Sequence, residues 1–188
     1  KIGYKIILLE ISNLKNNKVM QRVHPCLVSN DSLIAKVDNE LNTVIINDQI
    51  ADKVMVVGKG AGKKPTAASV MSDILNISDE NKKQFFVSKK EKINNYTSQD
   101  ISKREGRFYI RMGVDDEPGV LADITHFFKK QKISIKSMFQ LDDKKKNIVP
   151  LIFVTHKITE KKISLVLKKM KSIKKIKTNI VLLRIEEL

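Results

Sequence analysis

Residues 107–141 read RFYIRMGVDDEPGVLADITHFFKKQKISIKSMFQL, and this stretch decides the fold. Apolar residues alternate with other residues from Phe108 to Val114, which is the period of a half-buried strand. A second alternating run, from Ile133 to Leu141, predicts a second strand. The turn signal DDEPG follows the first run, and the apolar residues after it recur at the spacing of one helix face: Val120, Leu121, Ile124, Phe127 and Phe128.

The chain beyond this stretch completes a repeating order of elements. A turn is expected at 142–146, then a strand from Ile148 to Thr155 and a last strand from Ile176 to Ile185. Between these two strands one helix face is predicted, formed by Ile163, Val166, Leu167 and Met170. The order βαββαβ is the split ferredoxin-like arrangement, with both helices on one face of the sheet. We expect a second copy of the chain to cover the other face.

The segment Asp116–Leu121 offers the chemistry of an anion site. Pro118 fixes φ where the helix is expected to begin, and its missing N–H falls among the unpaired donors of the first turn. Gly119 lets another group approach the backbone, and Asp116 is placed to act as the N-cap by accepting from the amide of residue 119. The free N–H groups and positive dipole of such a helix start suit a carboxylate.

The motif V-x-D-x-P-G-V-L-A at 114–122, in this topology, resembles the ACT domain family of small-molecule sensors. The resemblance implies that two copies pair and that a free amino acid binds at their interface. The implied effector-binding residues are Asp116, Pro118, Gly119, Val120 and Leu121, with Met138 and Gln140 across from them. The alternative, a motif that caps a helix in a domain that only pairs, stays open at this point.

A glycine-rich turn lies in the amino-terminal third. A strand from Val54 to Val57 leads into the sequence GKGAG at 58–62, and a helix is expected to open near Pro65, with Val70, Ile74 and Ile77 on its buried face. Glycine-rich turns between a strand and a helix let backbone N–H groups meet a phosphate or a carbonyl. The spacing is not that of a P-loop, and no acidic residue completes a dinucleotide fingerprint.

Three blocks in order resemble homoserine dehydrogenase: GYKIILLEIS at 3–12, RVHP at 22–25 and G-x-G-A-G-x-x-P-T-A at 58–67. The resemblance implies that the glycine loop lies against the nicotinamide end of NAD(P), with cofactor-binding residues Gly60, Ala61, Gly62 and Thr66. Lys59 and Lys63 stand where the family commonly has Pro and Gly. These lysines either reach a cofactor phosphate or hinder its approach.

The two resemblances together imply an α+β chain with three regions. Residues 1–77 would be the carboxy-terminal part of the catalytic (substrate and dimerisation) domain, 78–106 a polar linker, part helical at best, and 107–188 an ACT regulatory domain. The parent reaction would be the NAD(P)-dependent interconversion of homoserine and aspartate semialdehyde. The family's nucleotide fingerprint and catalytic Lys and Asp would precede residue 1, so no catalytic residue is nominated, and we expect neither turnover nor tight cofactor binding by the chain alone. The alternative is a free-standing ACT regulatory or dimerisation module.

The composition of the chain limits the classes of partner that it is expected to bind. The net charge of +15 first suggests nucleic acid, but the excess is mostly scattered lysine, Trp is absent, and no aromatic stripe offers a stacking platform. No apolar run reaches the length of a membrane span. The single cysteine, Cys26, is expected to be buried and inert, and the three histidines have no metal-ligand spacing. We therefore expect a cytoplasmic homodimer, paired through the ACT sheets and the amino-terminal region, that binds a threonine-like amino acid and neither metal, nucleic acid nor membrane.

Overall fold

The computed structural model describes residues 2–50, 52–79, 95–141 and 148–188, and the turn predicted at 142–146 lies outside them. The chain forms two compact units, Lys1–Ser29 with Tyr96–Leu188, and Asn30–Asn95. These units do not coincide with the regions 1–77, 78–106 and 107–188, because the first hairpin joins the sheet of the carboxy-terminal region. The three-region division stays a prediction about domains.

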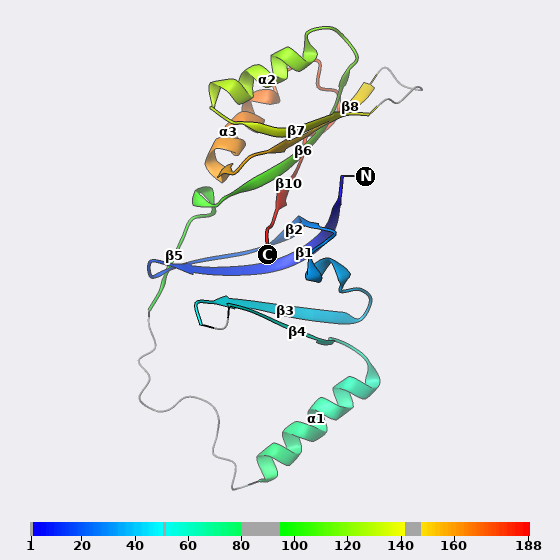
Figure 1. The fold of residues 1–188 in the computed structure, drawn as a ribbon, viewed down its shortest axis with the longest axis vertical. Helices are drawn as coiled ribbons and strands as arrows, with labels where there is room; N and C mark the ends of the chain where they lie inside the picture. Colours follow the sequence, from blue (N-terminus) through cyan, green and yellow to red (C-terminus); the bar gives the residue numbers. More distant parts are fainter. Residues whose placement is uncertain (1, 51, 80–94, 142–147) are drawn as a thin grey trace. The chain divides into compact units, whose positions relative to one another are not determined.

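The carboxy-terminal part has the predicted βαββαβ order (Figure 1). Its sheet runs β10-β6-β8-β7 with antiparallel neighbours. The elements are β6 (Glu105–Asp115), α2 (Val120–Lys130), β7 (Ile135–Gln140), β8 (Ile148–Thr155), the short β9 (Ile158–Thr159), α3 (Glu160–Met170) and β10 (Val181–Ile185). The ferredoxin-like fold predicted for this region is confirmed.

Both long helices of this unit bury one apolar face against the sheet. Ile124 and Phe128 of α2 and Ile163 of α3 are fully or almost fully buried, and they share a core with Phe108 and Phe153 of the strands. The Phe128 and Phe153 rings lie 5.4 Å apart between centroids. Alternating strand residues therefore point at the helices, as the sequence period requires.

The sheet extends beyond the predicted four strands. A hairpin of β1 (Tyr4–Lys15) and β2 (Lys18–Ser29) joins it, because β2 lies parallel to β10. In the stretch predicted to be a linker, β5 (Thr97–Ser98) pairs with β2, and a short 3-10 helix (Ile101–Lys103) follows it. The described end of that stretch is therefore built into the unit.

The sheet face away from the helices is partly covered by the chain itself. Tyr109, Ile152 and Val154 are buried there together with Leu27 and Ile185. Ile2, Tyr4 and Leu183 also pack on this cluster. Near the free edge, however, Phe139 of β7 pairs with Ile152 in register and keeps 39% of its surface exposed. A second copy would thus have less of this face to cover than the sequence predicts.

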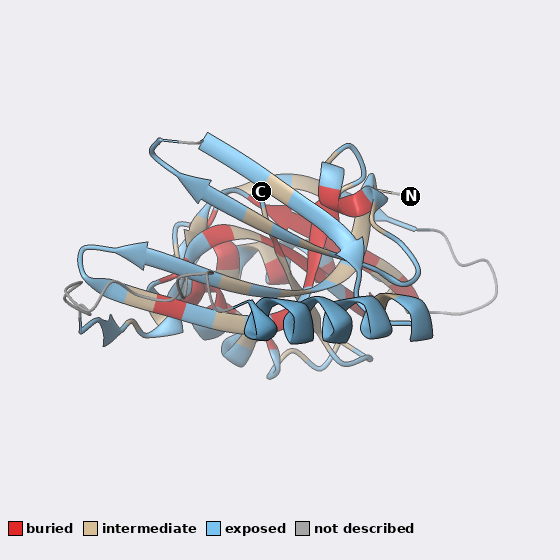
Figure 2. Cartoon of the chain, turned by 90° about the horizontal axis from the view of Figure 1, so that it is seen from below, coloured by how far each residue is buried: buried red, intermediate tan, exposed pale blue. Residues whose placement is uncertain are grey.

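The second unit is open by comparison. It contains a 3-10 helix (Leu33–Lys36), an antiparallel hairpin of β3 (Leu41–Asp48) and β4 (Asp52–Lys59), and α1 (Lys63–Ser78). Among the described residues of this unit, the buried apolar ones are Ile34 and Ala35, and no residue of α1 is buried (Figure 2). None of the described helices is long and apolar enough to cross a bilayer.

Candidate functional site

The loop between β6 and α2 presents its backbone to solvent. Residues 116–119 are exposed, and α2 begins at Val120. Gly119 has φ +89°, a conformation that side chains rarely adopt, and a Cβ built on it meets nothing within 4 Å. A ligand can therefore approach the start of α2 directly above Gly119.

The predicted capping of this helix is wrong. The N-cap residue is Gly119, which has no side chain to cap with, rather than Asp116, and Pro118 lies outside the helix. The left-handed conformation of Gly119 starts the helix three residues later than an N-cap at Asp116 would, so the Asp116 carboxylate does not cap the helix. The first helical bond is donated by the Asp123 amide to the Gly119 carbonyl, at 3.0 Å. No side chain caps α2, and the Val120 amide donates to the Glu117 carbonyl at 3.4 Å, so the amides of Leu121 and Ala122 are the ones left for an external acceptor.

The loop is held in place by the segment that follows α3. The Lys177 amide donates to the Gly113 carbonyl at 2.8 Å, and the Asp115 amide donates to the Lys175 carbonyl at 3.0 Å. The Lys177 ammonium also lies 3.0 Å from the Asp115 carboxylate, and the Lys175 ammonium lies 3.4 Å from that of Glu117. Within the described residues, Asp116 is the carboxylate of this loop without an ion-pair partner.

The other predicted effector residues do not all reach this loop within one chain. Val120 is 3% exposed and packs in the core, whereas Leu121 is 36% exposed. Met138 and Gln140 lie on β7, which is separated from β6 by β8. Since neighbouring strands are about 4.8 Å apart, β7 is roughly 10 Å from β6. Contact of Met138 or Gln140 with a ligand at this loop would call for a second chain.

The glycine loop between β4 and α1 is also exposed, but part of it is already paired. The Gly60 amide donates to the Glu40 carbonyl at 3.0 Å, and a Cβ on Gly60 would collide with the Asn42 amide group. Ala61, Gly62 and Thr66 are exposed, and Gly62 caps α1 with φ +126°. The amides left for a phosphate or a carbonyl are therefore those after Gly60.

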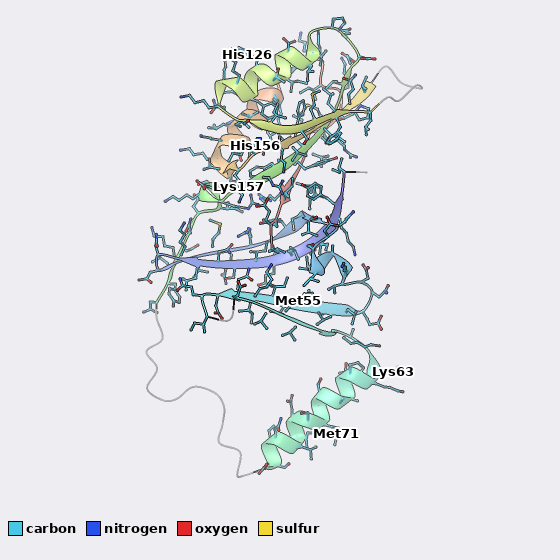
Figure 3. All side chains as sticks on the ribbon, in the orientation of Figure 1. Met55, Lys63, Met71, His126, His156 and Lys157 are labelled. Atoms are coloured by element: carbon cyan, nitrogen blue, oxygen red, sulfur yellow. The ribbon has the colours of Figure 1, made fainter. Side chains whose placement is uncertain are left out.

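The two lysines of this loop behave differently. The Lys59 ammonium lies 3.0 Å from the Glu40 carboxylate, and this ion pair lowers the pKa of Glu40. Lys63 is the first residue of α1, and its side chain extends away from the helix (Figure 3). The Lys59 ammonium is thus held in a half-exposed ion pair beside the hairpin, whereas Lys63 lies exposed at the start of α1.

The predicted buried face of α1 is wrong for the described structure. Val70 is 52% exposed, Ile74 49% and Ile77 83%. Apolar residues recur along α1, but no described element packs on them closely enough to bury them. The helix also begins two residues before Pro65, because Gly62 takes the N-cap position.

The remaining singled-out residues form no metal site. His126 lies on α2 and His156 just after β8 (Figure 3), and no group of three potential metal ligands exists among the described residues. Cys26 is fully buried, as predicted, and burial raises its thiol pKa to about 11. Such a thiol is protonated at neutral pH and is a poor nucleophile.

The sequence analysis missed a buried charge cluster, which we define as Arg22, Arg104, Glu160, Arg184 and Glu186. Arg22 lies on β2, Arg104 directly precedes β6, and Glu160 is the first residue of α3. Arg184 lies near the end of β10, and Glu186 directly follows that strand. One signal was available: only five of the 36 basic residues are arginines, and three of those five belong to this cluster. Arginine is the basic residue best suited to buried ion pairs.

Comparisons with known proteins show which families the two parts of the chain resemble. The family model for homoserine dehydrogenase matches residues 1–75, and the model for the ACT domain matches residues 108–175. The homoserine dehydrogenase of Pseudomonas aeruginosa is 29% identical over 194 aligned positions, covering 100% of this chain and 45% of that protein. The Helicobacter pylori enzyme is 28% identical, covering 99% of this chain and 44% of the relative.

The solved structures agree. A homoserine dehydrogenase from Thiobacillus denitrificans superimposes with a TM-score of 0.82 at 29% identity, over 99% of this chain and 43% of that one. The Staphylococcus aureus enzyme, at 21% identity and a TM-score of 0.62, shares the fold. The chain spans less than half the length of these relatives. Its two matched segments lie in the order that the fold and the motifs predict, and the chain corresponds to a carboxy-terminal part of homoserine dehydrogenase that carries an ACT domain.

Proposed function

We propose that this chain is the regulatory and dimer-forming portion of an NAD(P)-dependent homoserine dehydrogenase, which interconverts homoserine and aspartate semialdehyde. Its ACT domain binds a free amino acid, threonine or a relative of threonine from the same pathway, at the loop Asp116–Leu121. Binding favours one arrangement of the attached domains and so changes the activity of the enzyme. The continuous match of both segments to single relatives favours this function over a free-standing ACT module.

One observation carries the proposal: the uncapped start of α2 lies beside a carboxylate that has no ion-pair partner among the described residues. A zwitterionic amino acid needs an acceptor for its ammonium group and donors for its carboxylate. Asp116 supplies the acceptor, and the amides of Leu121 and Ala122 supply the donors, reinforced by the helix dipole. The open space above Gly119 lets the ligand backbone approach.

Calorimetry of the chain with threonine, methionine, isoleucine and lysine tests this site. We expect heat with at least threonine, and we expect Asp116→Asn to weaken that binding about tenfold or more, because it removes a charge-assisted hydrogen bond. The matched control is Glu117→Gln, next to Asp116 but already paired with Lys175, which should leave the affinity within about threefold. Absence of heat with all four amino acids, or an equal loss in both variants, would contradict the proposed site.

We also propose that two copies pair through the ACT sheet edge and the β3–β4 hairpin. One face of that hairpin carries four exposed β-branched residues, Val44, Ile46, Val54 and Val56, which are aligned in register. An isolated two-stranded hairpin with such a face is marginal in water, so burial by a partner is favoured. Phe139 offers a similar surface on β7.

The mass of the chain in solution tests the pairing. A dimer is expected, and Val44→Lys or Phe139→Lys should shift its dissociation constant upward by about tenfold or more, because a charge would be placed in an apolar interface. Ile50→Lys, at the 99% exposed hairpin turn, is the matched control and should leave the mass unchanged. A monomer at all concentrations would refute the pairing.

The glycine loop completes the proposed role. In the whole enzyme, Ala61, Gly62 and Thr66, with Gly60 holding the turn, lie against the nicotinamide end of NAD(P). The free amides after Gly60 and the exposed Lys63 support this placement. We place no catalytic residue in this chain.

A further inference from the structure

The junction between the β1–β2 hairpin and the ACT domain has few backbone bonds. β2 and β10 align at two residue pairs, Arg184 with Cys26 and Ile185 with Leu27. One further bond runs from the Glu186 amide to the Leu27 carbonyl, at 2.9 Å. By contrast, β1 and β2 align along all of Tyr4–Lys15, and β6 and β8 along Tyr109–Asp115. The backbone ladder at this junction is therefore the shortest among the main strands of the sheet.

The charge cluster spans this junction through Glu186. The Glu186 carboxylate accepts from Arg104 Nε at 3.2 Å and Nη2 at 2.9 Å, and from Arg22 Nη2 at 3.3 Å. Arg22 belongs to the hairpin, whereas Arg104 directly precedes β6 of the ACT domain. One carboxylate thus joins a residue within the homoserine dehydrogenase match to a residue next to the ACT match.

The cluster continues from Arg104 to the start of α3. Arg104 Nη1 lies 3.8 Å from Glu160, and Glu160 accepts from Arg184 Nε at 3.0 Å and Nη2 at 2.5 Å. The Glu160 amide donates to the Arg104 carbonyl at 2.8 Å. These contacts connect the start of α3 to Arg104, and Arg104 in turn contacts Glu186.

Burial makes these contacts strong and mutually dependent. The side chains of Arg104, Glu160, Arg22 and Glu186 are 4%, 7%, 8% and 10% exposed, and that of Arg184, at the edge of the cluster, is 23% exposed. The Arg104 guanidinium lies over the Phe108 ring and so close to Gly106 that a Cβ there would come within 2.6 Å of it. Removing one partner from such a cluster leaves an uncompensated buried charge, whereas a solvated pair loses little.

We propose that the charge cluster is the coupling element that makes the β1–β2 hairpin and the ACT domain open as one cooperative unit, with Glu186 at its centre. Arg22, Arg104 and Glu186 carry the link to the hairpin, and Glu160 and Arg184 carry the link to α3. The use of this coupling to transmit effector binding rests on the proposed function. The coupling itself does not, since it needs no ligand.

Native-state amide hydrogen exchange on the whole chain, without any amino acid, tests the coupling. Coupled elements open together and have similar protection. We expect amides of β2 and of β6 and β8 to have protection factors within about threefold of each other. Glu186→Gln should lower the protection of β1 and β2 by about tenfold or more relative to β6 and β8.

The matched control is Glu187→Gln, because Glu187 is adjacent but half exposed and pairs with Arg107 at 2.7 Å and Lys157 at 3.0 Å. It should leave both sets of amides within about threefold of the unmodified chain. If Glu186→Gln does not fold, Arg22→Gln decides, because it removes the guanidinium of the hairpin from Glu186, leaves His24 Nε2 at 3.8 Å from the same carboxylate, and keeps the contacts of Arg104 with both glutamates in place.

Three results would overturn the proposal. In the unmodified chain, the hairpin amides could already exchange more than about tenfold faster than those of β6 and β8. Alternatively, Glu186→Gln could lower protection equally in the hairpin and the ACT strands, or Glu187→Gln could have an effect as large as that of Glu186→Gln. Calorimetry without heat would leave this test unaffected, so failure of the coupling and failure of effector binding are told apart.

Discussion

Gly113→Ala probes the close approach between β6 and the segment after α3, which holds the loop between β6 and α2. Gly113 lies in β6, and a Cβ at this position would come 2.7 Å from Thr178 Cγ2 and 2.8 Å from Ile148 Cγ2. Thr178 cannot simply retreat, because its hydroxyl accepts from the Gly113 amide at 2.7 Å and the neighbouring Lys177 amide donates to the Gly113 carbonyl. The added methyl group must therefore push a bonded segment away from the strand.

Overpacking of this kind costs about 1–3 kcal/mol, and we expect Gly113→Ala to lower the free energy of unfolding by that amount. Thr178→Ser removes the nearer methyl group but keeps the hydroxyl, and Thr178 is exposed, so alone it should change stability by less than about 0.5 kcal/mol. The double variant should recover roughly half of the loss, because the contact with Ile148 remains.

Urea denaturation followed by far-ultraviolet circular dichroism gives the three free energies and the coupling between the two sites. A Gly113→Ala variant within about 0.5 kcal/mol of the unmodified chain, or a double variant no more stable than Gly113→Ala alone, would refute this explanation of the glycine.

Three further predictions follow from the buried side chains. Phe128→Ala should destabilise the chain by about 3–5 kcal/mol in the same denaturation assay, because it empties a fully buried site against Phe153; a loss under about 1 kcal/mol would contradict this packing. Burial is the main cause that lowers the pKa of His24 below 6.5, so the unfolded chain binds this proton more readily than the folded chain. The free energy of unfolding should therefore fall as the pH drops from 6.5 towards the folded pKa. His24→Gln should reduce this pH dependence, whereas the control His126→Gln, on the exposed side of α2, should leave it unchanged. Because burial raises the pKa of Cys26 to about 11, the native thiol should react with iodoacetamide at pH 8 about 100-fold more slowly than in urea; equal rates would show that it is accessible.

The ACT part was predictable because its signal is local. Ile124 and Phe128 lie on one helix face, and apolar residues alternate with other residues from Phe108 to Val114. The spacing within each element therefore predicts which of its residues are buried. The prediction of the α2 N-cap was wrong for a local reason: the sequence analysis placed Asp116 there, whereas the left-handed backbone of Gly119 puts Gly119 at that position.

The charge cluster and the exposed face of α1 could not be predicted by the same reasoning. Arg22 and Glu186 are 164 residues apart, and no periodicity links them. The apolar residues around Val70 and Ile74 predict that another element packs on α1. Their spacing does not identify that element. Of the predicted effector residues, those at 116–121 lie together in one loop of the chain. Met138 and Gln140 lie on β7, which is separated from β6 by another strand.

The parallel pairing of β10 with β2 bears on how the ACT region can be isolated. A fragment cut to residues 107–188 would lose β2 and leave β10 as a bare outer strand, with Leu183 and Ile185 no longer shielded by Leu27. Unprotected outer strands recruit other chains and aggregate. A well-behaved fragment for crystallisation or spectroscopy should keep the first 29 residues, fused by a linker in place of the second unit.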